Sequence, residues 1–160
     1  MAQTETAQAT NFFLDGNFAP VSDERDAQDM PVLGEIPKDL AGHFLRVGPN
    51  PAHIFNEAAY HTFDGDGMIH AMTFNEGSVH YRNRFVQTEG YKLEQAHGGW
   101  LYKGMNSMMD PTPSELPSGA PKNKNLANTA FAYHNKTLYA LHEPSQPTII
   151  DLPELTTKGA

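Results

Sequence analysis

The chain has 160 residues and a formal net charge of −8, from 11 basic and 19 acidic side chains. This length suits one ordinary domain, and an acidic chain without a Lys/Arg cluster gives no electrostatic footprint for a nucleic-acid partner. Cysteine is absent, which excludes a disulfide framework, a zinc-thiolate site and a thiol nucleophile, and predicts a reducing, cytoplasmic compartment.

The N-terminal part of the chain is punctuated by proline. Residues 1–11 are small and polar and lack the apolar run of a signal peptide, so we expect a disordered tail there. Residues 12–41 are predicted to run extended over a surface. Residues 43–47 read as a first buried strand that ends at Gly48-Pro49. No apolar run along the chain approaches the ~20 residues of a membrane-spanning helix.

The clearest local pattern is a predicted β-hairpin between residues 68 and 85. Residues 68–74 read as a strand with apolar side chains on both faces, and 75–77 as a three-residue turn. The return strand alternates, which predicts one packed face. Its two faces differ in character, with apolar side chains on one and basic side chains on the other: Val79, Tyr81 and Phe85 against His80, Arg82 and Arg84.

A second group of short strands follows a long loop. Residues 106–125 show no periodicity and are predicted to form that loop. Residues 130–133 and 137–141 read as a hairpin with its turn at 134–136, and 148–151 as a further short strand. The 12 prolines and 13 glycines favour such short elements over long helices. The sequence therefore predicts an all-β fold, compatible with a sandwich, a barrel or propeller blades.

The motif Asp64-Gly65-Asp66-Gly67 is acidic and rich in glycine. It is similar to part of a calcium loop, but the EF-hand pattern needs further oxygen ligands and a terminal Glu at fixed offsets. The next acidic residue is Glu76. We therefore favour a tight, self-bonded turn over a calcium site.

Eight histidines are spread along the chain without the paired spacing of a metalloprotease helix. His61 and His70 lie on either side of the acidic motif and could join Asp64 in a facial iron site. The alternative, which the spacing favours, is a pair of partly buried, hydrogen-bonded imidazoles.

Two further groups allow two interpretations each. Met105, Met108 and Met109 could line an apolar ligand channel, because Met adapts to irregular shapes, or could form a core patch under the long loop. Glu143 follows a predicted strand beside His142. Its carboxylate could orient a metal-bound histidine or could face solvent.

Several motifs, taken in order, resemble the amino-terminal part of the carotenoid cleavage oxygenase family. The similarity covers nearly all of the chain from Phe13 to about Asp151. Single pieces are weak, but the ordered series is specific. It includes Gly-Asn-Phe-Ala-Pro-Val at 16–21, Leu-Arg-Val-Gly-Pro-Asn-Pro at 45–51, His-Thr-Phe-Asp-Gly-Asp-Gly-Met-Ile-His at 61–70, Tyr-Arg-Asn-Arg-Phe-Val at 81–86 and Ala-Asn-Thr-Ala at 127–130.

This resemblance implies a seven-bladed β-propeller with a ferrous ion, Fe2+, held by four histidines on its axis. Dioxygen and an apolar polyene substrate would react there, and a carbon–carbon double bond would be cleaved. Thr129 matches the position that crowds an open coordination site, and Glu143 matches a glutamate that bonds a ligating imidazole; both are expected catalytic residues. His142 and Met105 match positions that face the substrate. Relatives that cleave phenolic stilbenes carry Lys and Tyr there, so we expect a carotenoid or apocarotenoid.

The family's iron-binding histidines match none of the eight histidines in the sequence. The first of them would lie in a His-Pro motif a short way beyond Glu143. We therefore expect residues 12–160 to form about the first two blades of a partial propeller that stops before the iron site, with no metal ligand and no activity of its own. The alternative is a non-catalytic remnant that binds an apolar molecule or a partner chain. The resemblance also allows peripheral contact of the full-length enzyme with a membrane.

Overall fold

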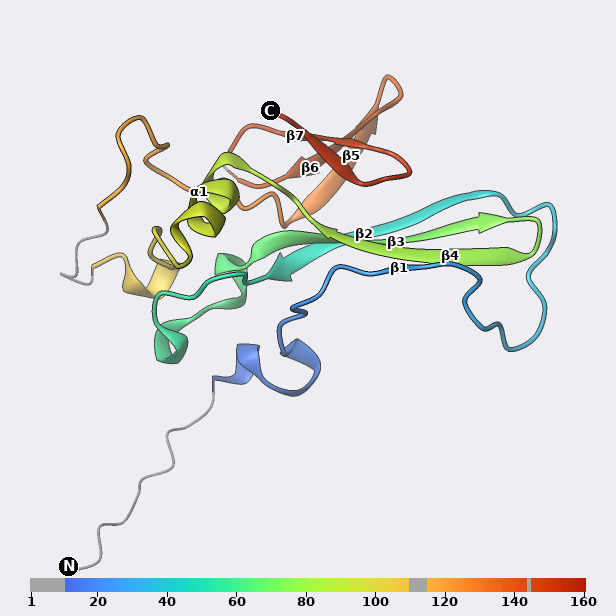
Figure 1. Ribbon diagram of the computed structural model, residues 1–160, viewed down its shortest axis with the longest axis horizontal. Helices are drawn as coiled ribbons and strands as arrows, with labels where there is room; N and C mark the ends of the chain where they lie inside the picture. The colour runs from blue at the N-terminus through green and yellow to red at the C-terminus, as the bar shows by residue number, and fades with distance from the viewer. Residues whose placement is uncertain (1–10, 110–114, 144) are drawn as a thin grey trace, which may run out of the picture.

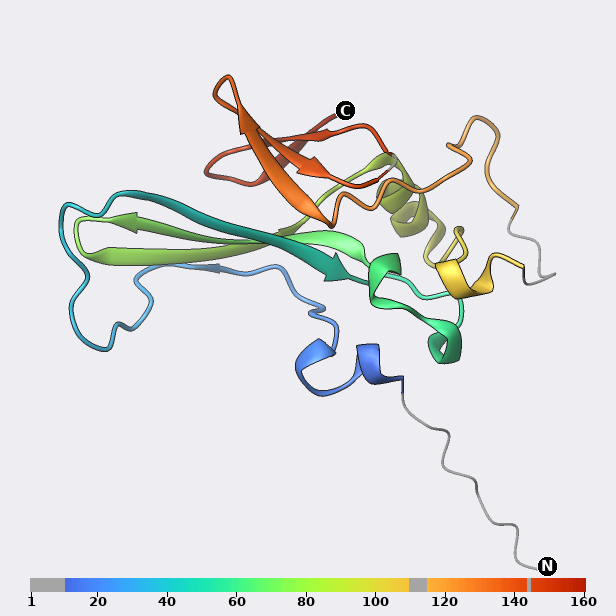
Figure 2. The same cartoon turned by 180° about the vertical axis from the view of Figure 1, so that it is seen from behind.

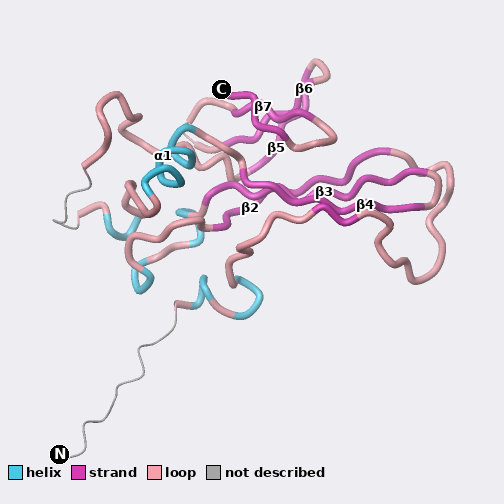
Figure 3. The backbone as a smooth tube through the Cα atoms, in the orientation of Figure 1, coloured by secondary structure: helices cyan, strands magenta, loops and turns pink. Residues whose placement is uncertain are grey.

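The computed structural model describes residues 11–109, 115–143 and 145–160, and within them the chain forms two four-stranded antiparallel sheets (Figures 1 and 3). The predicted all-β class is confirmed, with one α-helix added. The predicted disordered tail lies outside the described residues, except for Asn11. The Asn11 side chain accepts the Phe13 N–H and caps a short 3-10 helix, η1 (Phe12–Leu14).

The first sheet, sheet A, has the strand order β1-β4-β3-β2. Its strands are β1 (Asp26–Ala27), β2 (Gly42–Asn50), β3 (Asp66–Asn75) and β4 (Ser78–Phe85). The predicted hairpin is confirmed, but Asn75 pairs with Ser78, so that its turn has two residues rather than three. Glu76 and Gly77 adopt φ of 47° and 81°. Positive φ at both positions is the turn geometry whose twist suits a hairpin.

The second sheet, sheet B, follows the order of the sequence, β5-β6-β7-β8. Its strands are β5 (Ala130–His134), β6 (Thr137–Leu141), β7 (Thr148–Asp151) and β8 (Thr156–Gly159). Here too the predicted three-residue turn is a two-residue turn, because His134 pairs with Thr137. Strand β8 was not predicted, because Thr-Thr-Lys-Gly carries no apolar alternation.

Sheet B packs on sheet A where β5 contacts β2, and the long β3–β4 hairpin extends beyond it (Figures 1 and 2). The core between the sheets holds small and branched apolar side chains on both sides. They are Ile69 and Ala71 of β3, with Leu45 and Val47 of β2, against Ala127, Leu138, Ala140, Ile150 and Leu155.

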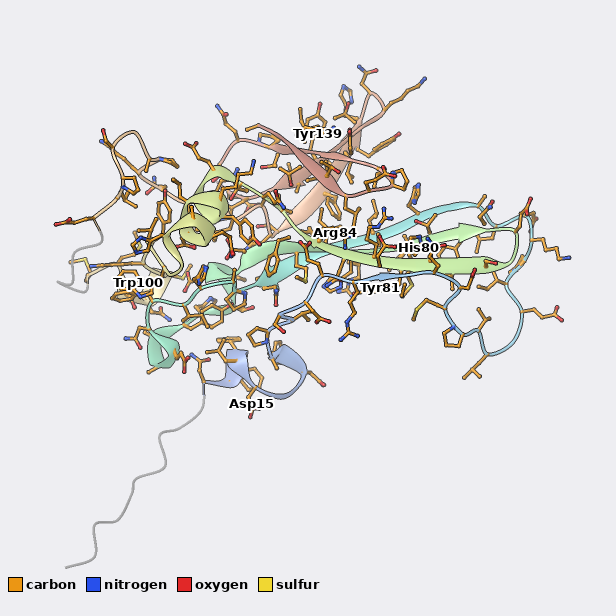
Figure 4. All side chains as sticks on the ribbon, in the orientation of Figure 1. Asp15, His80, Tyr81, Arg84, Trp100 and Tyr139 are labelled. Atoms are coloured by element: carbon orange, nitrogen blue, oxygen red, sulfur yellow. The ribbon has the colours of Figure 1, made fainter. Side chains whose placement is uncertain are left out.

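The sequence predicted one packed face for β4, but both faces are covered: Phe85 of the apolar face is 8% exposed, and the basic face is packed as well. Ile69 lies opposite Arg84 and Ala71 opposite Arg82, and cross-strand partners share a face, so the basic face of β4 is the one turned toward sheet B (Figure 4). Arg82 donates to the Pro153 carbonyl at 2.7 Å and to Asp26 at 2.7 Å. The guanidinium groups therefore extend the apolar core as a polar rim instead of facing solvent.

The opposite face of sheet A is covered by the segment between residues 20 and 27. The side-chain amide of Asn83 accepts the Arg25 N–H at 2.6 Å and donates to the Asp23 carbonyl at 2.9 Å. In the same way, the side-chain amide of Asn50 accepts the Val21 N–H at 2.7 Å and donates to the Val21 carbonyl at 2.8 Å. Two buried amides thus hold an extended strand. The predicted extended path is correct here and wrong at η1 and η2 (Gly16–Phe18).

One element was not predicted, the helix α1 (Glu89–His97). The Thr88 hydroxyl accepts the Tyr91 N–H at its start, and Gly98, with φ of 76°, ends it. Short 3-10 turns complete the fold: η3 (Glu57–Ala59), η4 (Thr62–Asp64) and η5 (Met105–Ser107). Among the described residues, no helix has the length and apolar character needed to cross a membrane.

Candidate functional site

A cavity of about 820 Å³ lies where the ends of sheet A, α1 and the start of sheet B meet. Apolar side chains and a few charged groups share its wall, which is typical of ligand sites. All four residues singled out from the sequence line this one cavity, although they come from different elements: Met105, Thr129, His142 and Glu143.

The acidic motif forms the turn between η4 and β3, next to the cavity. Asp64 closes a capping box, because one of its oxygens accepts the His61 N–H at 3.2 Å. Its other oxygen accepts the Met105 N–H at 2.7 Å, which fixes the start of η5. Gly104 has no room for a Cβ, since that atom would overlap the Asp64 carboxylate. The turn is self-bonded, as the sequence analysis favoured, and it places Met105.

The two histidines near this turn take part in local hydrogen bonds. His61 Nδ1 accepts the Phe63 N–H at 3.2 Å, and His70 Nδ1 lies 2.8 Å from the Tyr81 hydroxyl. In the part of the chain that the structure describes, no three His, Asp or Glu side chains come together in a way that could hold a metal ion. These residues therefore do not fit the facial iron site considered from the sequence.

Thr129 sits at the start of β5 behind a tightly bonded turn. The Asn128 amide donates to the Gly65 carbonyl at 2.7 Å and to the Phe63 carbonyl at 3.1 Å. The Thr129 N–H donates to the Leu141 carbonyl at 3.0 Å, and its hydroxyl donates to Asn128 Oδ1 at 3.1 Å. Both the backbone and the side chain of Thr129 are thus held in place, with the residue exposed at the cavity.

His142 and Glu143 follow the end of β6. His142 Nδ1 lies 3.0 Å from the Ser145 hydroxyl. Burial lowers the pKa of His142, against a smaller opposing effect of the Glu143 carboxylate, so the imidazole is neutral at pH 7. Glu143 is exposed at the cavity wall. The structure therefore places a neutral imidazole and a carboxylate next to each other at one side of the site.

The sequence left two interpretations open for the three methionines: an apolar channel lining or a core patch under the loop. Met105 and Met108 line the cavity and are 51% and 71% exposed, and Met109 is 95% exposed. A core patch under the loop is therefore wrong for all three, and two of them line the cavity. The exposed thioethers can adapt to the shape of an apolar ligand.

Three charged side chains that the sequence analysis missed are buried beside the cavity. The Lys124 ammonium lies 2.6 Å from Asp66 Oδ1 and 2.6 Å from Glu94 Oε2, and the exposed fractions of these side chains are 9%, 2% and 2% for Lys124, Asp66 and Glu94. Lys124 is aligned as a hydrogen-bond donor only toward Glu94. Burial raises the pKa of the Asp66 carboxyl, and Lys124 opposes that shift.

Aromatic side chains form part of the cavity wall. Phe55 lines it and packs edge to face on Trp100, with ring centroids 4.4 Å apart. Tyr60 is 7% exposed. Its burial raises its pKa, and the Asp64 and Asp66 carboxylates add to the effect, so the phenol stays protonated. Nothing in the local sequence pattern indicates these two aromatic residues as a lining.

A family model described as retinal pigment epithelial membrane protein matches residues 18–160. The chain belongs to this family. Among curated members, it is 38% identical over 155 residues to carotenoid 9,10(9',10')-cleavage dioxygenase 1 of Arabidopsis thaliana, a match that covers 89% of the chain and 28% of the relative. It is 45% identical over 89 residues to the carotenoid cleavage oxygenase of Mycobacterium tuberculosis, covering 55% of the chain and 18% of that protein.

Solved structures of the family share the fold of the chain. The lignostilbene dioxygenase of Pseudomonas brassicacearum superimposes with a TM-score of 0.80 at 30% identity, over 92% of this chain and 30% of the other. The Synechocystis apocarotenoid oxygenase, in a Glu-to-Gln variant, gives 0.71 at 33% identity, over 88% and 29%. The chain thus spans less than a third of the length of the relatives it matches.

Other solved variants of the Synechocystis enzyme replace a threonine and a tryptophan with alanine. In that enzyme the tryptophan lies 13 positions, and the substituted glutamate 14 positions, after the threonine. His142 and Glu143 stand at the same distances after Thr129 in this chain.

Proposed function

We propose that the chain is the amino-terminal segment of an iron(II)-dependent dioxygenase that cleaves a carbon–carbon double bond of a carotenoid or apocarotenoid. Family membership and the activity in the names of its relatives support this proposal. The observation that carries it is that four residues selected from the sequence alone line a single cavity of about 820 Å³. That volume lies within the range of small-molecule sites.

In this proposal Thr129 and Glu143 act at the reacting end of the cavity. The Glu143 carboxylate would accept a hydrogen bond from an imidazole that ligates the iron, which fixes the orientation of the ring and raises its basicity. Thr129 would limit access to the open coordination site. The common spacing with the threonine and glutamate substituted in the Synechocystis enzyme supports both roles.

Met105 and His142 would contact the substrate. A half-exposed thioether and a neutral imidazole suit a long apolar polyene better than a charged ligand. The fold alone does not separate polyenes from stilbenes, because the lignostilbene dioxygenase superimposes as well. The choice of a carotenoid or apocarotenoid rests on the absence of Lys at 142 and Tyr at 105 and on the sequence relatives.

The iron would supply dioxygen chemistry. Since the described side chains do not form a metal site, the part we assign to this chain is to bind the polyene, shape the cavity and orient Glu143 and Thr129.

A graft tests the proposal. Residues 18–160 replace the matching segment of the Synechocystis apocarotenoid oxygenase, and iron content and cleavage of a carotenoid and an apocarotenoid are measured. We expect carbonyl products from the graft, a loss of about 10–100-fold in iron affinity or activity for Glu143→Gln, and normal iron with altered turnover for Thr129→Ala. A graft that binds iron but cleaves neither substrate would favour a non-catalytic binding module. Normal iron content and normal turnover in Glu143→Gln would mean that Glu143 is a surface carboxylate without a role at the iron.

A further inference from the structure

The loop that leads into β5 carries Thr129, and it begins at a buried charge cluster. Lys124 comes from this loop, Asp66 from β3 and Glu94 from α1, so that one ammonium joins three elements. The second oxygen of Glu94 accepts the backbone N–H groups of Leu101 and Tyr102 at 2.8 Å and 3.1 Å. The orange segment that contains Lys124 passes beside α1 before it enters β5 (Figure 2).

Bonds to neighbouring elements continue along the loop toward Thr129. The Gly67 N–H donates to the Leu126 carbonyl at 2.7 Å. Asn125 donates to the Gln146 carbonyl at 2.9 Å, and Asn128 bonds the acidic turn. Hydrogen bonds to neighbouring elements therefore fix the path of the loop at successive positions.

The loop also adopts a shape that its own backbone does not favour. Ala127 is fully buried with φ of 48°, in the left-handed region that side chains other than glycine seldom occupy. Two glycines make room for the loop. A Cβ on Gly67 would overlap the Ala127 carbonyl oxygen, and a Cβ on Gly90 would lie 2.7 Å from Lys124 Cγ. Such a conformation persists only where its surroundings hold it.

We propose that Lys124 is a positioning residue that holds this loop so that Thr129 faces the cavity, with Asp66 and Glu94 as its two fixed partners. One ammonium stands between two carboxylates that are almost completely buried. Without it, two like charges face each other in a dry site, and the loop moves away to let water in. The part of this inference that concerns polyene binding rests on the proposed function.

The experiment uses the 160-residue chain and two variants of the cluster. Lys124→Met removes the ammonium and keeps the length of the side chain. The triple variant Asp66→Asn, Glu94→Gln, Lys124→Met removes all three charges, so that no unpaired charge remains to unfold the protein. Lys158→Met is the matched control, because Lys158 pairs with Asp151 at 2.8 Å on sheet B with both side chains about half exposed.

Two quantities are measured on each protein. Amide hydrogen exchange reports the Gly67–Leu126 and Thr129–Leu141 bonds, with the distal Met30–Val79 pair, in which the Met30 N–H donates to the Val79 carbonyl at 2.9 Å, as internal reference. Quenching of Trp100, the single tryptophan, by an apocarotenoid alcohol reports the affinity of the cavity. For both cluster variants we expect exchange at Gly67 and Thr129 to rise by about tenfold or more, and affinity to fall by a similar factor, with the reference pair unchanged. Lys158→Met should change neither.

The proposal is overturned if the triple variant folds and keeps wild-type exchange and affinity, or if exchange rises by the same factor at the distal reference pair, which would indicate a general structural role. If Lys124→Met fails to fold, the triple variant decides. If the wild-type chain does not bind the alcohol, the proposed function fails, while the exchange at Gly67 and Thr129 still decides the role of Lys124.

Discussion

The two ends of sheet A differ in how firmly the sequence holds them. At the end near sheet B, β3 begins with three buried residues, Asp66, Gly67 and Met68. Asp66 pairs with Lys124 of the loop, and Met68 lies against the buried amide of Asn83. At the distal end, Met72 and Phe44 are 43% and 55% exposed. The same strand thus serves as part of a packed site at one end and as a surface hairpin at the other. Function can be expected where backbone and charges are fixed from several sides.

The largest difference should appear between two methionines on the same face of β3. Met68 is completely buried, whereas Met72 is 43% exposed. Met68→Ala should lower the free energy of unfolding by about 3 kcal/mol, because it leaves a cavity in a packed interior. Met72→Ala should cost less than about 1 kcal/mol. Urea unfolding of both variants measures the two values, and equal costs would mean that the two ends are packed alike.

A pair of glycines tests the same difference through the backbone. A Cβ on Gly67 would overlap the carbonyl oxygens of Ala127 and Leu126, while a Cβ on Gly48 of β2 would meet nothing within 4 Å. Gly67→Ala should cost about 2–3 kcal/mol, because the backbone of the loop must shift. Gly48→Ala should be close to neutral or slightly stabilising. Urea unfolding measures both variants, and the same unfolding midpoint for Gly67→Ala as for the wild type would contradict the comparison.

Hydrogen-bonding side chains should show a smaller contrast. Asn83 is fully buried and bonds the backbone of Asp23 and Arg25, whereas the bond between His43 and Thr73 at the distal end is exposed. Asn83→Ala should cost about 1.5 kcal/mol or more, since it leaves a backbone donor and acceptor without their partner. Thr73→Ala should stay within about 0.5 kcal/mol. Thermal melts of the two variants measure the difference. Equal shifts of the two melting temperatures from the wild-type value would refute the prediction.

The smallest effect concerns pH. Burial lowers the pKa of His70, and Arg46 adds to the shift. The folded state therefore binds this proton less readily than the unfolded chain, so its contribution to stability is present above the unfolded pKa of about 6.5 and is lost as the pH falls below it. Relative to His70→Gln, the wild type should lose stability between pH 7.5 and pH 5. Parallel pH profiles of the two proteins would contradict the assignment.

Sequence patterns predicted the strands better than the site, for physical reasons. The two hairpins combine alternating side chains with turn residues, so both could be predicted to within a residue or two. Helix α1 could not, because its buried face carries Gly90 and Glu94 rather than an apolar stripe. A glutamate normally indicates solvent. Its burial depends on the Leu101 and Tyr102 N–H groups and on Lys124, which lies 30 positions further along the chain.

The second covered face of β4 was missed for a related reason. The alternation predicted one packed face, yet Phe85 is buried on one side while Arg82 and Arg84 on the other side lie toward sheet B and bond Asp26 of β1. A two-residue strand such as β1 has no periodicity from which it could be predicted. In the site, the residues selected by resemblance were Met105, Thr129, His142 and Glu143. The charge cluster beside the cavity depends on partners that are distant in sequence, so it emerges only in the fold.

The central claim is that an apolar polyene binds at the junction of the two sheets and not on the exposed apolar surface at the distal end. Met105 at the cavity and Met72 at the distal end are 51% and 43% exposed, which makes them a matched pair. The measurement is the dissociation constant of an apocarotenoid alcohol, from Trp100 quenching, for Met105→Gln and Met72→Gln. The account predicts a loss of affinity of about tenfold for Met105→Gln and none for Met72→Gln. Wild-type affinity in Met105→Gln with a loss in Met72→Gln would contradict it.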